Sequence, residues 1–177
     1  QGQMCIRDRE YTWEYENPAT QTDLSIGIFR CTHGHQLVMK IINSKLSINT
    51  NPKCLNDISL EVVKSVNNSG IKNGNCTLYI KHTSASLVIQ ENADPAVLRD
   101  IESFFKSLVS EDENLYEHNS EGPDDMPAHI RSILTNTSLS IPIINSKLEL
   151  GTWQGIYLYE HRSQSYSRKV IVNIIGE

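Results

Sequence analysis

The chain from Gln36 onward alternates short β-like runs with stretches of helical periodicity. QLVMKIINSKLSIN begins there and is typical of one long strand or a bent pair of strands. Five later runs also have the character of strands: CTLYIKHT, SASLVIQEN, SLSIPII, WQGIYLYEHR and RKVIVNII. Strands grouped around a few helices predict an α+β domain, with a mixed or antiparallel sheet and two to three helices.

Three stretches have the apolar spacing of a helix. The first has a cap at Asn56 or Asp57 and runs to about Asn67. The second begins with Asp94 as the expected N-cap and Pro95 in the first turn. The third is MPAHIRSILTN, which follows an acidic loop. The apolar stripe of the second helix is expected to lie in the core and comprises Leu98, Ile101, Phe105 and Leu108, with Val97 and Phe104 at its margins.

Residues 1–36 lack a sustained period and could contain a short strand around Ile26 to Phe29. Their opening MCIRDR looks like translated vector sequence. His33 and His35 could form one side of a metal site, but without a partner motif we interpret them as incidental histidines. The expected organisation is therefore an N-terminal extension over 1–36 and one domain over 37–177.

Composition excludes several classes of protein. The 177 residues are 38% hydrophobic with a formal net charge of -5, which argues against general nucleic-acid binding. No apolar run approaches the roughly 18–20 residues that cross a bilayer, and the polar N-terminus is not a secretory signal. Four cysteines without a C-x-x-C pair favour reduced thiols, with Cys76 buried in a strand. We therefore expect a cytoplasmic protein with neither nucleic acid nor membrane as a partner.

The segment YEHNSEGPDDMPAHI holds His118 and His129 among four carboxylates, with no lysine or arginine. His129 falls near the start of the third helix, where the helix dipole disfavours an imidazolium ion. His82 continues the apolar face of its strand, so it is either a core histidine or a ligand. Together the three imidazoles would match a catalytic zinc site with an open fourth position. The alternative for the segment is a solvated acidic loop.

Other polar residues have two readings each. The hydroxyls of Thr83, Ser84 and Ser86 could bind phosphate oxygens or satisfy an irregular strand junction. Arg162 and Arg168 could bind a phosphate or a neighbouring subunit's carboxylate, whereas His161 and Lys169 fit a solvated turn. In LGTWQG, Trp153 is a candidate for the core, and Gln154 offers both a donor and an acceptor.

Several of these motifs, in this order, resemble the YjbQ-like family. The resemblance covers roughly residues 37–177 and rests on HTSASLVIQENADPAVLRDIESFF, YEH, EGPDDMPAHIRSIL, SLSIPI, LGTWQGIYLYEHR and RKVIVNIIGE. It implies a compact α+β homotrimer with sites near subunit boundaries, and weak thiamine phosphate synthase activity. It also implies metal ligation by His82, His118 and His129. Where the family has a turn glycine, this chain has Ser146, and Asn145-Ser146 is still expected to form the turn.

The resulting hypothesis is a metal-binding enzyme that joins a hydroxymethylpyrimidine diphosphate to a thiazole phosphate and releases pyrophosphate. The ion is expected to be zinc, or magnesium with a diphosphate substrate. The expected partner is a small phosphorylated metabolite. The alternatives are a metal-dependent hydrolase of another phosphate or amide substrate, and a non-catalytic trimer that binds a metal and an anionic metabolite. The candidate catalytic residues are Glu91, Asp94, Asp125 and Gln154, and the candidate phosphate-binding residues are Thr83, Ser84, Ser86, Arg131, Arg162 and Arg168.

Overall fold

The computed structural model describes residues 2–6, 9–16, 25–31 and 38–177. These residues form two antiparallel sheets and three α-helices, which confirms the predicted α+β class. The large sheet contains, in spatial order, β1 (Gly2–Ile6), β2 (Arg9–Glu16), β3 (Ser25–Cys31), β4 (Val38–Asn49), β11 (Ser167–Gly176), β6 (Gly74–Ile80), β8 (Ser138–Ile144) and β9 (Lys147–Leu148). The small sheet has the order β5 (Cys54–Asp57), β10 (Gln154–Glu160), β7 (Ala85–Glu91).

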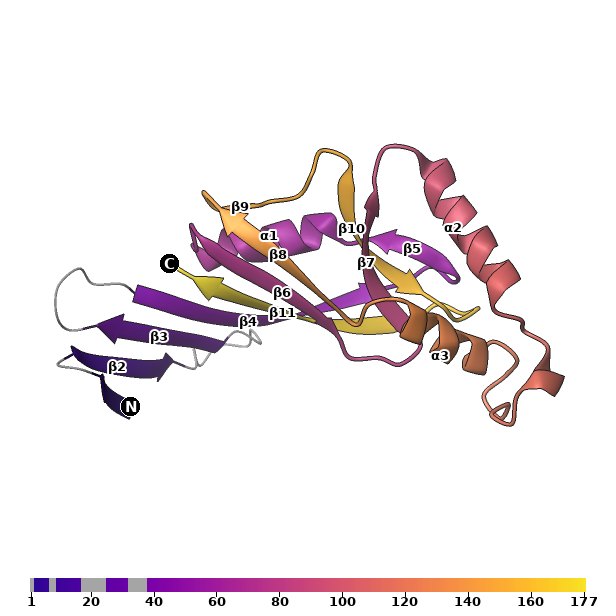
Figure 1. Cartoon of the computed structure of the whole chain (residues 1–177), viewed down its shortest axis with the longest axis horizontal. Coiled ribbons are helices and arrows are strands. Elements are labelled where there is room, and N and C mark those ends of the chain that lie inside the picture. The colour runs from indigo at the N-terminus through magenta and orange to yellow at the C-terminus, as the bar shows by residue number, and fades with distance from the viewer. Residues whose placement is uncertain (1, 7–8, 17–24, 32–37) are drawn as a thin grey trace.

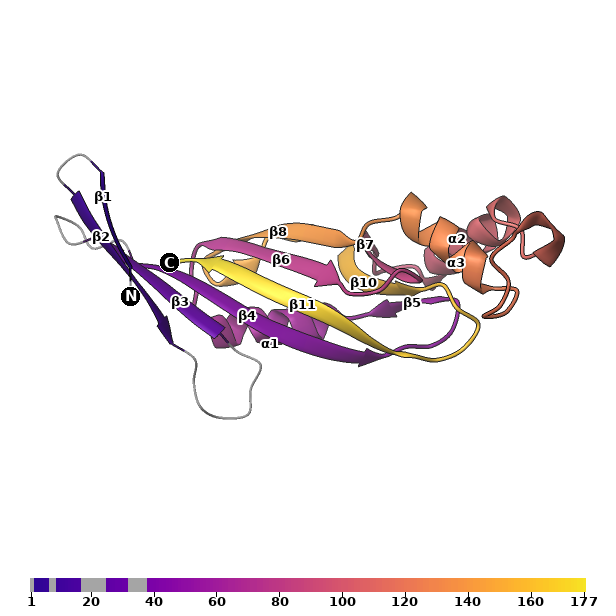
Figure 2. The ribbon, with the colours of Figure 1, turned by 90° about the horizontal axis from the view of Figure 1, so that it is seen from below.

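The helices are α1 (Ser59–Ser69), α2 (Pro95–Leu108) and α3 (Asp125–Leu134), with a 3₁₀ turn at Glu113–Leu115. In both views α2 and α3 gather at one end of the molecule, and β1 to β3 lie at the other (Figures 1 and 2). No helix among the described residues has both the length and the apolar character needed to span a bilayer. His33 and His35 lie outside the described residues, whereas the predicted short strand near Ile26 is confirmed as β3.

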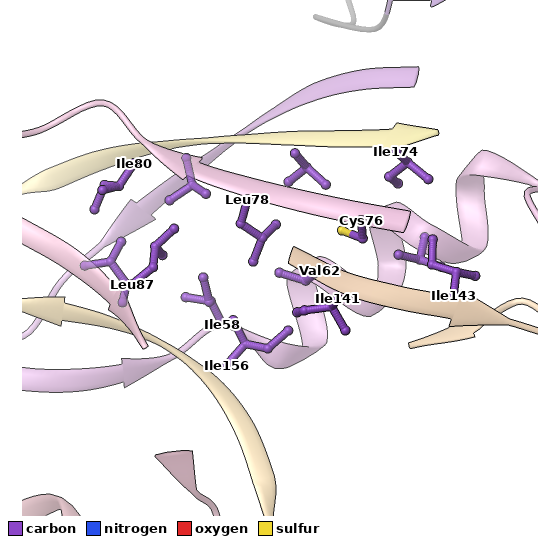
Figure 3. Close-up of a cluster of buried hydrophobic side chains, with 14 of the residues drawn as sticks. Ile58, Val62, Cys76, Leu78, Ile80, Leu87, Ile141, Ile143, Ile156 and Ile174 are labelled. Atoms are coloured by element: carbon purple, nitrogen blue, oxygen red, sulfur yellow. The ribbon is translucent and has the colours of Figure 1, made fainter. Parts of the chain in front are cut away.

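The main core lies between the two sheets and α1 (Figure 3). Period-two alternation puts Cys76, Leu78 and Ile80 of β6 on its inner face, as predicted, and Cys76 is a buried free thiol. Ile58 at the N-cap of α1 and Val62 and Val66 within the helix also belong to this core. The helix begins one or two residues later than predicted because Cys54–Asp57 pairs with β10 as a strand, which sequence periodicity did not reveal.

A second, smaller core lies on the opposite face of the small sheet. Alternation along β10 sends Ile156 and Leu158 to the main core and Tyr157 and Tyr159 to the second one. α2 covers these tyrosines with Leu98, Ile101 and Phe105, but no residue of the helix is fully buried. The expected core role of this stripe is therefore wrong at Leu108 and at the marginal Phe104, which are exposed because α2 lies on a narrow three-stranded sheet.

Local signals were more reliable at the ends of elements. The Asp94 carboxylate accepts the backbone N–H of Ala96, and Pro95 lies in the first turn of α2, as predicted. Asn145 and Ser146 form the tight turn between β8 and β9 with φ values of 51° and 63°. Trp153 is 65% exposed, so the expectation of a core position for it is wrong.

Candidate metal site

Three side chains near the start of α3 converge on one point. His118 comes from the loop before the helix, and Asp125 and His129 lie one turn apart on α3. One ligand atom from each residue lies within 4.8 Å of the other two. His118 Nε2 is 2.8 Å and His129 Nε2 is 3.6 Å from the same carboxylate oxygen, Asp125 Oδ2. Two imidazoles and a carboxylate are a common donor set for a divalent transition metal.

The hydrogen bond of His129 settles which ring nitrogen is available. Its Nδ1 lies 3.0 Å from the backbone oxygen of Thr83, and a carbonyl oxygen can only accept. Nδ1 therefore carries a proton, and Nε2, which faces Asp125, is the ring nitrogen left for a metal ion. A backbone carbonyl on the far nitrogen is the usual support for a metal-ligating histidine.

The Asp125 carboxylate is divided between two partners. Its Oδ1 forms an ion pair with Arg162 Nη1, while Oδ2 faces the two histidines. Arg162 also donates from Nε to Asp124 Oδ2 at 3.1 Å. Burial raises the pKa of Asp124, but hydrogen bonds from Ser163 and Arg162 outweigh it, so the net pKa is below the usual range. Asp124 is consequently held as an anion beside the buried guanidinium of Arg162.

His82 does not join this group. Its Nε2 accepts the backbone N–H of Lys169 at 2.8 Å. This contact agrees with the alternative interpretation, in which His82 is hydrogen-bonded to the backbone and is not a ligand. Burial, followed by the charge of Arg168, lowers the pKa of His82, which keeps the ring neutral. The set that the structure gathers therefore differs from the predicted three histidines: Asp125, predicted to be catalytic, stands where His82 was expected.

An open hollow of about 870 Å³ lies beside His129. Its wall includes the predicted residues His82, Thr83 and Ser84, and Lys81 supplies a cationic side chain. The apolar side chains of Ile133 and Tyr79 at this hollow are 81% and 52% exposed. The hollow is thus rich in hydroxyls, has a metal-type donor at one side and is bordered by exposed apolar surface.

Three predicted catalytic residues lie away from this group. Glu91 and Gln154 pair with each other at one end of β7 and β10. α3 contacts β7 at the other end, where the backbone oxygen of Ala85 accepts a hydrogen bond from the Ser132 hydroxyl of α3. Six residues of strand separate Ala85 from Glu91, or about 20 Å. Asp94 caps α2, and Gln154 accepts the N–H of Gly151 within its own turn. Glu91, Asp94 and Gln154 therefore lie apart from the metal group, and their catalytic role stays a prediction.

The predicted phosphate-binding arginines are engaged inside the protein. Arg131 is 1% exposed and donates to Glu102 at 2.9 Å, and Arg168 donates to both oxygens of the fully buried Glu160. Arg162 is committed to the aspartates before and within α3. A phosphate would have to displace a carboxylate from Arg162 and Arg168, so their assignment to phosphate is corrected to buried ion pairing. Arg131 is equally buried and uses only Nη1 for its ion pair, while its Nε and Nη2 have no hydrogen-bond partner among the described residues.

His161 was expected in a solvated turn and is instead 1% exposed. Its Nε2 lies 2.9 Å from Ser86 Oγ, and its ring packs on Tyr159 at 4.4 Å between centroids. Burial, and then the charges of Arg131 and Arg168, lower its pKa to about 3. The Ser86 hydroxyl is fully buried in this contact, so its assignment to phosphate is corrected as well.

Comparison with known proteins gives one consistent result. Residues 44–177 match the family model "UPF0047 protein YjbQ-like". A UPF0047 protein of Synechocystis is 54% identical over 132 residues, covering 75% of this chain and 90% of that protein. A crystal structure of a YbjQ-like protein of unknown function from Sulfolobus solfataricus has a TM-score of 0.69 at 28% identity, covering 78% of this chain and 99% of that one. An uncharacterised YjbQ/UPF0047 protein from Clostridium acetobutylicum has a TM-score of 0.68 at 39% identity, covering 73% and 98%.

These names correct the expected activity. The family and its relatives are named as UPF0047 proteins, and the Sulfolobus relative is called a protein of unknown function, so nothing in them supports thiamine phosphate synthase activity. The arginines meant to neutralise the leaving pyrophosphate are also held in internal ion pairs. We therefore drop the synthase assignment. What the match and the shared fold do establish is that this chain belongs to the YjbQ-like UPF0047 family.

Proposed function

We propose that this protein binds one divalent transition-metal ion, zinc in the first place, through His118, Asp125 and His129. The observation that carries the proposal is the convergence of two imidazole nitrogens on a single buried carboxylate oxygen. Neighbouring ligand atoms around a tetrahedral zinc ion are about 3.4 Å apart. The distances of 2.8 and 3.6 Å from Asp125 Oδ2 to the two histidines bracket that value.

The donors are also oriented for this role. The Thr83 carbonyl holds the proton of His129 on Nδ1, and Arg162 occupies the other oxygen of Asp125. A bound zinc ion with an open position would act as a Lewis acid toward an oxygen atom of a ligand in the neighbouring hollow. This arrangement makes the protein a candidate metalloenzyme.

The hollow supplies the second part of the proposal, a small anionic metabolite as partner. Lys81 offers a positive charge, and Thr83 and Ser84 offer hydroxyl groups that suit phosphate or carboxylate oxygens. We also propose a homotrimer, supported by the exposed Tyr79, Ile133 and Leu134 on the elements that form the hollow. Light scattering of the purified protein tests the trimer, and a molar mass of one chain would contradict it.

Zinc titration of wild-type protein and single variants tests the metal site. Asp125→Asn and His129→Ala should each lower the zinc affinity by more than about 100-fold, beyond the 10–100-fold typical of residues that only support a ligand. His82→Ala should change it by less than about 3-fold, because that ring bonds to the Lys169 N–H instead. Equal losses in the His82 and His129 variants would contradict the proposed set, and absence of zinc binding by the wild-type protein would overturn the proposal.

A further inference from the structure

Arg162 links two segments that are far apart in the sequence. It follows β10 by two residues and is buried beside the start of α3. Its Nε, Nη1 and Nη2 atoms donate to Asp124 Oδ2, Asp125 Oδ1 and the backbone oxygen of Glu121, respectively. All three nitrogens of the guanidinium group are therefore bound to one five-residue segment, residues 121–125.

That segment carries or adjoins every member of the proposed metal group. Asp125 is a ligand itself, His129 lies one turn later, and His118 precedes the turn in which Gly122 takes a φ of 104°. Ser163 strengthens the link, since its backbone N–H and hydroxyl both donate to Asp124 Oδ2 at 2.7 and 2.8 Å. The connection between β10 and β11 thus holds the loop and the first turn of α3 in place.

The consequence for Asp125 is specific. A carboxylate that is free to rotate can offer a metal ion both of its oxygens or swing away from it. Here Oδ1 is bound to Arg162, and only Oδ2 faces the histidines. Oriented partners of this kind typically improve metal affinity 10–100-fold. The planar fork of arginine can bind two carboxylates at once, which a lysine ammonium on a flexible stem does less well.

We infer that Arg162 is a positioning residue that restricts Asp125 to one-oxygen ligation of the metal ion. The inference rests on the proposed metal site and deepens it. It acts through Asp125, since no ligand atom of the group belongs to Arg162.

Arg168 provides a matched control. It lies on the next strand, is as deeply buried as Arg162, and also stacks on the Tyr166 ring. Its carboxylate partner is Glu160, which has no contact with the metal group. Arg168→Gln therefore removes an equally buried cation without touching the ligands.

The test uses Co²⁺ as the probe, because its visible absorption reports coordination number and geometry. Wild-type protein, Arg162→Gln, Arg162→Lys and Arg168→Gln are titrated with Co²⁺, and their thermal unfolding is recorded in parallel. We expect Arg162→Gln to bind about 10–100-fold more weakly with a changed spectrum. Arg162→Lys should lose about 3–10-fold as a partial rescue, and Arg168→Gln should keep the wild-type affinity and spectrum despite a lower melting temperature.

The outcomes separate the two proposals. If the wild-type protein binds no Co²⁺ or Zn²⁺, the metal site and the role of Arg162 fall together. If the wild-type protein binds and Arg162→Gln gives the same affinity and spectrum, only the positioning role is overturned. The same holds if Arg168→Gln perturbs the spectrum as strongly, because the effect would then be general destabilisation. Should Arg162→Gln fail to fold, Arg162→Lys decides, and its identity with wild type in both readouts would overturn the inference.

Discussion

Two buried carboxylate–arginine pairs flank the connection between β10 and β11, and they differ in what the carboxylate has left to offer. Both oxygens of Glu160 are taken by interior donors, namely Arg168, the Thr50 hydroxyl and the backbone N–H of Arg162. In the other pair, one oxygen of Asp125 is bound to Arg162 and the second faces two imidazoles. Burial and pairing alone therefore do not identify a functional site. The informative feature is a buried carboxylate oxygen, Asp125 Oδ2, that faces side chains able to bind a metal ion.

The largest effect is expected from breaking the Glu160–Arg168 pair, in which both carboxylate oxygens are occupied; we call this the closed pair, and Asp125–Arg162 the open pair. Glu160→Gln leaves Arg168 as a buried cation with a neutral partner, so the free energy of unfolding should fall by about 3–5 kcal/mol. Urea denaturation at neutral pH measures this loss. Zinc affinity of the folded variant should stay within about 3-fold of wild type, because Glu160 touches none of the proposed ligands. A large loss of zinc affinity would show that the two pairs are not independent.

The stability of the region around the closed pair should also depend on pH, through the buried His161 that follows Glu160. Its pKa is about 3 in the folded protein and about 6.5 in the unfolded chain, so the unfolded chain binds the proton first as pH falls. The free energy of unfolding should therefore decrease by about 2 kcal/mol between pH 7 and pH 5. Comparing denaturation curves at both pH values for wild type and His161→Gln isolates this residue. An unchanged pH dependence in the variant would assign the effect to other groups.

The smallest change in stability is expected at Asp124, which shares Arg162 with the open pair. Ser163→Ala removes the Ser163 hydroxyl, one of three groups that donate to Asp124 Oδ2, at a position where water can replace it. We expect a loss of about 1 kcal/mol in the free energy of unfolding, measured by urea denaturation. Thr50→Val, which removes a fully buried donor to Glu160, is the matched variant on the closed side and should lose more. A larger loss in Ser163→Ala than in Thr50→Val would mean that the hydroxyl beside the open pair contributes more to folding than the one beside the closed pair.

Sequence reasoning recovered what depends on local periodicity. The inward face of β6, the Asp94 cap and the Asn145-Ser146 turn all follow from neighbours a few residues apart. It also brought His118 and His129 together, because both adjoin the same helix start. It failed where the partner is distant: Lys169, 87 residues from His82, takes that ring's Nε2, and Arg162 lies 37 residues from Asp125. Such pairings depend on strand order, which composition and spacing do not encode.

The arrangement of α2 has a further consequence for how the molecule opens. This helix of fourteen residues has none fully buried and rests on Tyr157 and Tyr159 through three half-buried apolar side chains, separate from the main core. Its Glu102 adds two polar links, to Arg131 of α3 and to the hydroxyl of Tyr159. Elements with so little apolar contact are the ones that detach first in native-state fluctuations. Release of α2 would break the Glu102 bonds and open the second core, while the main core between the two sheets and α1 stays intact.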